Sequence, residues 1–240
     1  MAISVVSRLN AADSNGTAGF VTAAFTTNTA GNTIIAIGLC PSRVTSMSTP
    51  TDTKGNTYTL IASGSNGTSV SYNVWAVYNI PVSAGTNTVT MNDSNIACGL
   101  FIYEIAGLAT SAAFDKTMKT AGTSVLSMTS GSTLTLGFNN ELVLGGFVTN
   151  STSGGTFTVG GGFSNLLQQN PTNGGNQATE EQIVSTGASI AATATAALSA
   201  SNGNDISFVV TFSDTAIVPR AFKFNNSGLR PHPFSPGLAR

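Results

Sequence analysis

Apolar side chains recur at every second position over much of this chain, and that period restricts the fold more than any other feature. Residues 70–80 (VSYNVWAVYNI) show it clearly, with Tyr72 and Val74 on one face and Ser71 and Asn73 on the other. Such alternation is typical of a β-strand, whose successive side chains point to opposite faces. Bulky apolar groups, including Trp75, also lie on the second face, which predicts an inner strand covered on both sides.

Similar segments recur along the chain, separated by clusters of Gly, Asn, Asp and Ser that favour tight turns. The further predicted strands are residues 3–9, 19–27, 33–39, 57–62, 86–91, 97–105, 133–138, 141–148, 182–186, 189–198 and 205–212. The Ala-rich segment 188–200 is predicted as strand rather than helix, because it contains threonines that disfavour a helix. Many short strands joined by turns predict an all-β fold, an antiparallel β-sandwich that is jelly-roll-like.

The composition narrows the classes of function. Charged residues make up 8% of the 240 positions, whereas an ordinary soluble domain has about 25%. The hydrophobic fraction of 41% supplies enough apolar residues for a core, so a disordered chain is not expected. Nine Lys and Arg residues spread over the chain are too few for a nucleic-acid-binding face. These features predict an extracellular-type or virion-type β protein.

The charges are unevenly distributed. Residues 1–219 carry five basic and ten acidic residues, a net charge of −5, whereas residues 220–240 carry four basic and no acidic residues, +4. Four of the eight prolines and the sole histidine, His232, also lie after position 218. We therefore predict a β-sandwich body over residues 1–218 and an extended, basic, Pro-rich C-terminal tail over residues 219–240.

The N-terminal sequence MAISVVSRLN lacks the basic and apolar regions of a signal peptide, and no apolar run approaches the ~20 residues that span a bilayer. We expect a protein synthesised in a host cytoplasm without a signal peptide and carried in a released particle, with no membrane partner. Cys40 and Cys98 are expected to be buried free thiols, with a disulfide between them as the alternative.

Candidate catalytic groups are few. The acids outside predicted turns are Glu104, Asp115, Glu141, Glu180 and Glu181. Glu104 shares an otherwise mostly apolar strand face, for which a structural role is favoured over catalysis. His232 stands in the tail, away from any nucleophile motif, and no Cys/His cluster has zinc spacing. We expect no enzymatic activity, no cofactor and no metal; the Asn/Asp-rich turns at 13–17, 91–95 and 201–205 leave calcium as an alternative.

Aromatic side chains on β-sandwiches can stack on sugars. Four of the five candidates lie in strongly apolar strands where core packing is the default, namely Tyr72, Trp75, Tyr78 and Tyr103. Tyr58, in the polar stretch TKGNTYTL, is predicted to be half exposed and is the possible glycan contact.

An ordered series of motifs resembles a known family. It comprises TDTKGNTYTL (51–60), VWAVYNIPVSAGTNTVT (74–90), IYEIAGL (102–108), NNELVLGGF (139–147), GGGF (160–163), EEQIVSTGASIAATAT (180–195) and SFVVTF (207–212). Over roughly residues 30–213 this series is similar to jelly-roll-like β-sandwich domains of phage structural proteins and bacterial surface proteins. The resemblance implies a fold and an exposed setting, usually without an enzymatic role.

The tail LRPHPFSPGLAR (229–240) resembles short C-terminal anchoring peptides of virion proteins. Prolines lower the cost of ordering such a peptide, while its aromatic and basic side chains fill pockets and pair with acids. The predicted anchoring residues are Arg220, Phe222, Phe224, Arg230, Pro231, His232, Phe234, Leu238 and Arg240.

The sequence therefore predicts a phage capsid decoration or head-fibre protein, docked through its tail to capsid, portal or tail proteins. We expect a homo-oligomer, with a trimer as the working assumption, because symmetric assembly is usual. The alternative is a carbohydrate-binding or receptor-binding adhesin module that contacts host glycans.

Overall fold

The structure is a computed structural model that describes residues 2–12, 19–25, 29–42, 47–81, 85–93, 98–151, 155–169, 175–185, 193–200 and 203–215. These residues contain sixteen strands and no helix. The strands are β1 (Ser4–Ala12), β2 (Gly19–Phe25), β3 (Thr33–Cys40), β4 (Thr51–Asp52), β5 (Thr59–Ser65), β6 (Ser71–Val77), β7 (Asn87–Asp93), β8 (Gly99–Ala106), β9 (Phe114–Thr123), β10 (Ser127–Thr129), β11 (Glu141–Thr149), β12 (Phe157–Thr158), β13 (Ser164–Gln169), β14 (Gln177–Val184), β15 (Thr195–Leu198) and β16 (Asn204–Ser213).

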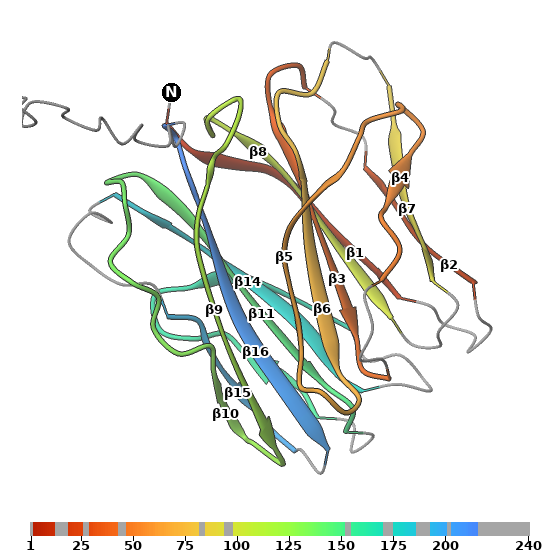
Figure 1. Ribbon diagram of the computed structural model, residues 1–240, viewed down its shortest axis with the longest axis vertical. Coiled ribbons are helices and arrows are strands. Elements are labelled where there is room, and N and C mark those ends of the chain that lie inside the picture. The colour runs from red at the N-terminus through yellow and green to blue at the C-terminus, as the bar shows by residue number, and fades with distance from the viewer. Residues whose placement is uncertain are drawn as a thin grey trace, which may run out of the picture.

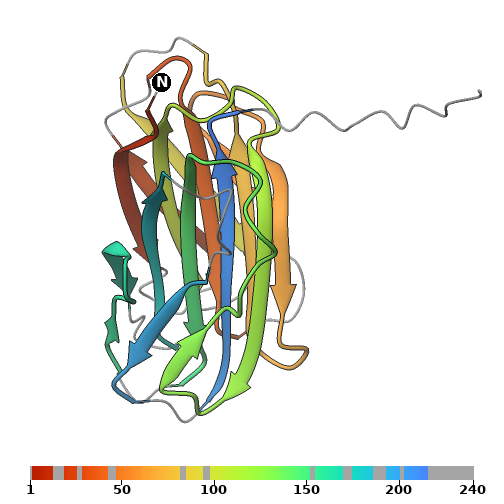
Figure 2. The same ribbon diagram turned by 90° about the vertical axis from the view of Figure 1, so that its left-hand side faces the viewer.

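The strands form four layers. Two five-stranded sheets, ordered β1-β8-β3-β6-β5 and β13-β14-β11-β16-β9, pack face to face. A three-stranded sheet covers each outer side, β2-β7-β4 on the first sheet and β10-β15-β12 on the second (Figure 1). The strands of the large sheets run along the long axis of the molecule (Figure 2). All the strand pairs are antiparallel, so the predicted all-β sandwich is confirmed.

The strand order of the first half of the chain is repeated in the second half. Adding eight to each label converts β1-β8-β3-β6-β5 into β9-β16-β11-β14-β13, and β2-β7-β4 into β10-β15-β12. Each half thus has jelly-roll-like connectivity, in which strands far apart in the sequence become neighbours. The sandwich is built from two units of the same topology that share a central interface.

The central core lies between the two large sheets. Tyr72 on β6 stacks on Phe208 on β16, with ring centroids 3.8 Å apart, and the hydroxyl groups of Tyr103 and Thr179 form a 2.6 Å hydrogen bond. Burial raises the pKa of Tyr72 to about 12, so its hydroxyl stays neutral. Strands β3, β6 and β11 are buried along their whole length. The predicted inner strand at residues 70–80 is therefore confirmed by β6.

Two outer cores explain why these strands are apolar on both faces. On the first, Trp75 of β6 packs with Val89 and Met91 of β7. On the second, Phe147 of β11 packs with Phe157 of β12, and their ring centroids are 6.0 Å apart. A strand covered on both sides needs apolar groups at nearly every position, as in TIIAIGLC of β3.

Most predicted strands coincide with observed ones, and the differences have physical reasons. The prediction at residues 133–138 is wrong, because no strand is described there. Leu134 and Leu136 would share one face of a strand, yet the first is exposed and the second is buried. Strand β9 was missed because it forms a largely exposed sheet edge and needs no apolar alternation. The prediction at 182–186 overlaps only the end of β14.

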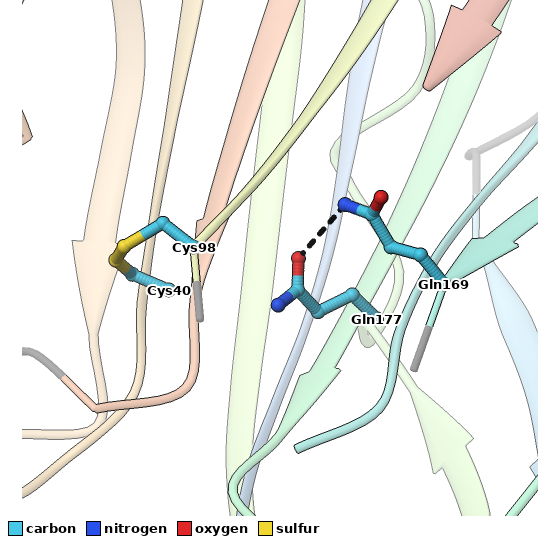
Figure 3. The surroundings of a disulfide bond; sticks show 4 residues. All are labelled: Cys40, Cys98, Gln169 and Gln177. Carbon is cyan, nitrogen blue, oxygen red and sulfur yellow. Dashed lines mark hydrogen bonds between the residues drawn. A yellow bond between two sulfur atoms is a disulfide. The ribbon is translucent and has the colours of Figure 1, made fainter. Parts of the chain in front are cut away.

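Cys40 and Cys98 form a disulfide, so the expectation of free thiols is wrong although both residues are buried (Figure 3). Leu39 on β3 pairs with Gly99 on β8, and one step further along this antiparallel register the two cysteines stand opposite each other. Their Cα atoms are 4.2 Å apart, the short spacing of an opposed cross-strand pair. Strand register, which alternation alone does not reveal, decides the pairing.

Gly99 lets the two large sheets approach closely beside this disulfide. The Gln169 side chain donates a 3.2 Å hydrogen bond to the Gln177 side chain (Figure 3). A Cβ atom at position 99 would lie 1.6 Å from Nε2 of Gln169. A larger residue at position 99 would displace the amide side chains of β13 and β14 that cover β8.

Candidate functional site

A polar cleft lies where an edge strand of one large sheet meets the edge of the other. It is lined by β1 from the first half and by β13, β14 and the preceding turn from the second half, and its volume is about 460 Å³. The lining includes Ser4, Val5, Arg8, Asn165, Glu181 and Gln182. Small-molecule sites typically have volumes of about 300–1,000 Å³.

Irregular backbone positions the side chains of the cleft. The pairing of β1 with β8 shifts register between Val5 and Ser7, and that of β13 with β14 shifts between Ser164 and Leu167. Asn165, within the second irregularity, has a φ of 51°, in the left-handed region that non-glycine residues rarely occupy. Bulges of this kind redirect side chains and are frequent beside functional sites.

An ion pair joins the two sides of the cleft. The guanidinium of Arg8 donates to both carboxylate oxygens of Glu181, at 2.7 and 3.1 Å. The amide of Asn165 donates to the same carboxylate at 2.7 Å. The Glu181 side chain is 5% exposed and that of Arg8 31% exposed. The carboxylate is thus held inside the cleft while the guanidinium reaches solvent.

The neighbouring residue on β14 points to the opposite face of the sheet, as the period of two requires. Glu180 is buried towards the β12–β15 layer, where its Oε2 accepts a 2.8 Å hydrogen bond from the Gly160 N–H. Burial raises the pKa of Glu180 to about 7, and hydrogen bonds from the Gly160 and Thr195 backbone oppose the shift. The two adjacent acids therefore cannot act on one substrate.

Glu141 and Asp115 are brought together at the beginning of β11 and β9. Glu141 is fully buried and accepts a 3.0 Å hydrogen bond from the Phe138 N–H, while Asp115 accepts one from the Gly137 N–H and pairs with Lys116. Burial raises the pKa of Glu141 to about 7, and the nearby Asp115 carboxylate adds to the shift. Both acids tie the 137–138 turn to the sheet.

Glu104 lies buried on β8 and contacts residues that precede β3. It is 1% exposed, and its Oε1 accepts 2.7 Å hydrogen bonds from the Thr29 N–H and from the Asn32 side chain. The carboxylate therefore fixes the loop that leads into β3.

The expected exposure of Tyr58 is wrong. The residue is 6% exposed, its ring belongs to the outer core of the first half, and its hydroxyl donates a 3.0 Å hydrogen bond to Asp52. Burial and the Asp52 carboxylate raise the pKa of this hydroxyl. Burial alone would raise the pKa of Asp52, but hydrogen bonds from Asn87, Asn56 and Tyr58 outweigh it and lower the pKa. The ring of Tyr58 is not available to stack on a sugar.

The other residues singled out in the sequence have different outcomes in the structure. Tyr72, Trp75 and Tyr103 are core residues, as predicted. The tail, including every predicted anchoring residue from Arg220 to Arg240, lies outside the described residues. Asn165 lies in none of the motifs quoted from the sequence, and Gln182 lies in the motif 180–195 but was not singled out. Arg8 could have been found as the sole charge in the predicted strand 3–9.

Within the described ranges, no group of three or more His, Cys, Asp or Glu residues is placed to hold a metal ion. The described part of the chain also contains no helix with the length and hydropathy of a membrane span. No protein-family model matches the chain, and neither the curated proteins nor the solved structures include a match.

Proposed function

We propose that this protein is a non-enzymatic structural component of a bacteriophage virion, a capsid decoration or head-fibre protein that docks through residues 219–240. The observation that carries the proposal is the division of charge, −5 over residues 1–219 and +4 over residues 220–240. A basic segment rich in proline and phenylalanine suits docking onto an acidic, pocketed partner surface.

The fold supports the same proposal. Jelly rolls recur in viral capsid proteins and in lectins, although a fold alone does not assign a function. Four layers packed on three hydrophobic cores make a stable body with few surface charges. Such a body suits display on a particle that meets varied ionic conditions, because its stability depends little on screened charge pairs.

Incorporation into particles tests the proposal directly. The full chain, a variant lacking residues 219–240, and a variant with the same 22 residues in scrambled order would each be expressed during growth of the phage that encodes the protein. We expect the full chain to co-purify with density-purified particles and both variants to be lost. The absence of the full chain from particles would refute the virion assignment, whereas incorporation of the truncated variant would refute the anchoring role.

The alternative function is a carbohydrate-binding or receptor-binding adhesin module. The observation that favours it is the polar cleft between β1 and β13–β14, whose size suits a small ligand. The two functions are compatible, because a docked protein can also bind a host surface.

A further inference from the structure

The cleft between β1 and β13–β14 has the features of a built site rather than of a chance gap between sheet edges. Residues from both halves of the chain line it, and backbone irregularities occur in both β1 and β13 where they border it. Asn165 has a left-handed backbone conformation, in which asparagine is enriched among non-glycine residues. That conformation accompanies a 2.7 Å hydrogen bond from the Asn165 amide to Glu181 at the cleft wall.

The chemistry of the lining identifies the class of ligand. Arg8 and Glu181 neutralise each other, so these two groups together add no net charge to the cleft. The bidentate bond uses two of the five N–H groups of the guanidinium, so the partly exposed Arg8 has three N–H groups outside the ion pair. Gln182 also borders the cleft, and its amide carries both a donor and an acceptor, but by the period of two its side chain leaves β14 on the side of Glu180 and not on that of Glu181.

Apolar groups complete the lining. Ile183 is 49% exposed and lines the cleft together with Val5. A surface that combines neutral donors, neutral acceptors and aliphatic groups matches a sugar ring, which presents hydroxyl groups at its rim and C–H groups on its faces. An anionic ligand is disfavoured, because the Glu181 carboxylate neutralises the guanidinium of Arg8 and would repel a second negative charge.

We propose that this cleft binds a neutral saccharide, with Arg8, Asn165 and Gln182 as hydrogen-bonding residues and Ile183 as the apolar contact. The site does not depend on the virion assignment, because the lining residues named above all belong to the body of the protein. Saccharide binding and particle incorporation can therefore fail separately.

Asn165→Gly is the most informative variant. Glycine accepts a positive φ without strain, so the backbone is retained while the amide is removed. Asn79→Gly is the matched control, because Asn79 is exposed, has a φ of 53° and does not line the cleft. Gln182→Ala removes the amide of a second residue that borders the cleft and leaves both partners of the ion pair in place.

Binding would be measured on the purified full chain by saturation-transfer-difference NMR with glucose, galactose, mannose and N-acetylglucosamine, and then by titration. We expect at least one sugar to bind, and Asn165→Gly and Gln182→Ala each to weaken it about tenfold, the value of one hydrogen bond. Asn79→Gly should bind as the original chain does. Thermal melting of each variant verifies folding.

The opposite results would overturn the proposal. One such result is that none of these sugars shows saturation transfer. Another is that both cleft variants bind the sugar with unchanged affinity, or that Asn79→Gly loses as much affinity as they do. Binding of inorganic sulfate or phosphate in place of the neutral sugars would also overturn it, since it would show that Arg8 acts as an anion receptor.

Discussion

At the scale of the residue, buried carboxyl groups control how this protein responds to pH. Glu141 and Glu180 are fully buried, and burial raises the pKa of each to about 7. An acid whose pKa is raised by folding binds more protons in the folded chain than in the unfolded chain between the two pKa values. The free energy of unfolding therefore falls as the pH rises through that window, from about 4.5 to about 7.

We expect the free energy of unfolding to be lower at pH 8 than at pH 5, and Glu180→Gln to reduce this difference. The amide oxygen of glutamine can still accept the hydrogen bond from Gly160, but the side chain has no charge to bury. The stabilisation of the variant at pH 8 should reach roughly 3 kcal/mol at most, from 1.4 kcal/mol per pKa unit. Urea unfolding at both pH values measures it. If the free energy of unfolding changed with pH in the same way in Glu180→Gln and in the original chain, the raised pKa of Glu180 would be contradicted.

At the scale of the element, alternation predicted which segments are strands but not how they pair. Strands β3, β6, β8 and β16 were predicted because each contacts two cores and carries apolar side chains on both faces. Edge strand β9 and the bulged β13 lacked that pattern, and the cleft depends on β13. The partners Arg8 and Glu181 are 173 residues apart, and only the packing of the two sheets brings them together.

The disulfide is also a property of paired elements, and its contribution can be measured. It closes a loop with a sequence separation of 58 residues, for which the loss of unfolded-chain entropy corresponds to about 4 kcal/mol. We expect the double variant Cys40→Ala and Cys98→Ala to unfold at a lower urea concentration than the oxidised chain. Its free energy of unfolding should be lower by up to about 4 kcal/mol. Thiol titration of the urea-unfolded, unreduced chain should find no free thiol. Two free thiols per chain would contradict the pairing.

At the scale of the whole molecule, the halves depend on each other. The central core takes Tyr72 and Phe101 from the first half and Leu142 and Phe208 from the second, so neither half can bury these side chains alone. The repeated strand order could not be predicted, because it lies in connectivity rather than in recurring short motifs. The sandwich class could be predicted, because period and composition agree throughout the body.

We expect the full chain to unfold in one cooperative transition, because exposing the central interface would remove a large part of the core of both halves. Calorimetry should give equal calorimetric and van't Hoff enthalpies. Tyr72→Ala, which removes the ring stacked on Phe208, should lower the midpoint of that single transition. Two separate transitions would show that the halves are independent units.

The shared topology of the halves also bears on how the protein behaves at low abundance. Two separate jelly-roll subunits with these apolar sheets would have to find each other, and their association would weaken on dilution. Here one chain contains both, so each sheet meets its counterpart at the high effective concentration that covalent linkage provides. The sandwich, and with it the cleft that both halves build, should remain intact when a single copy of the chain is all that is present.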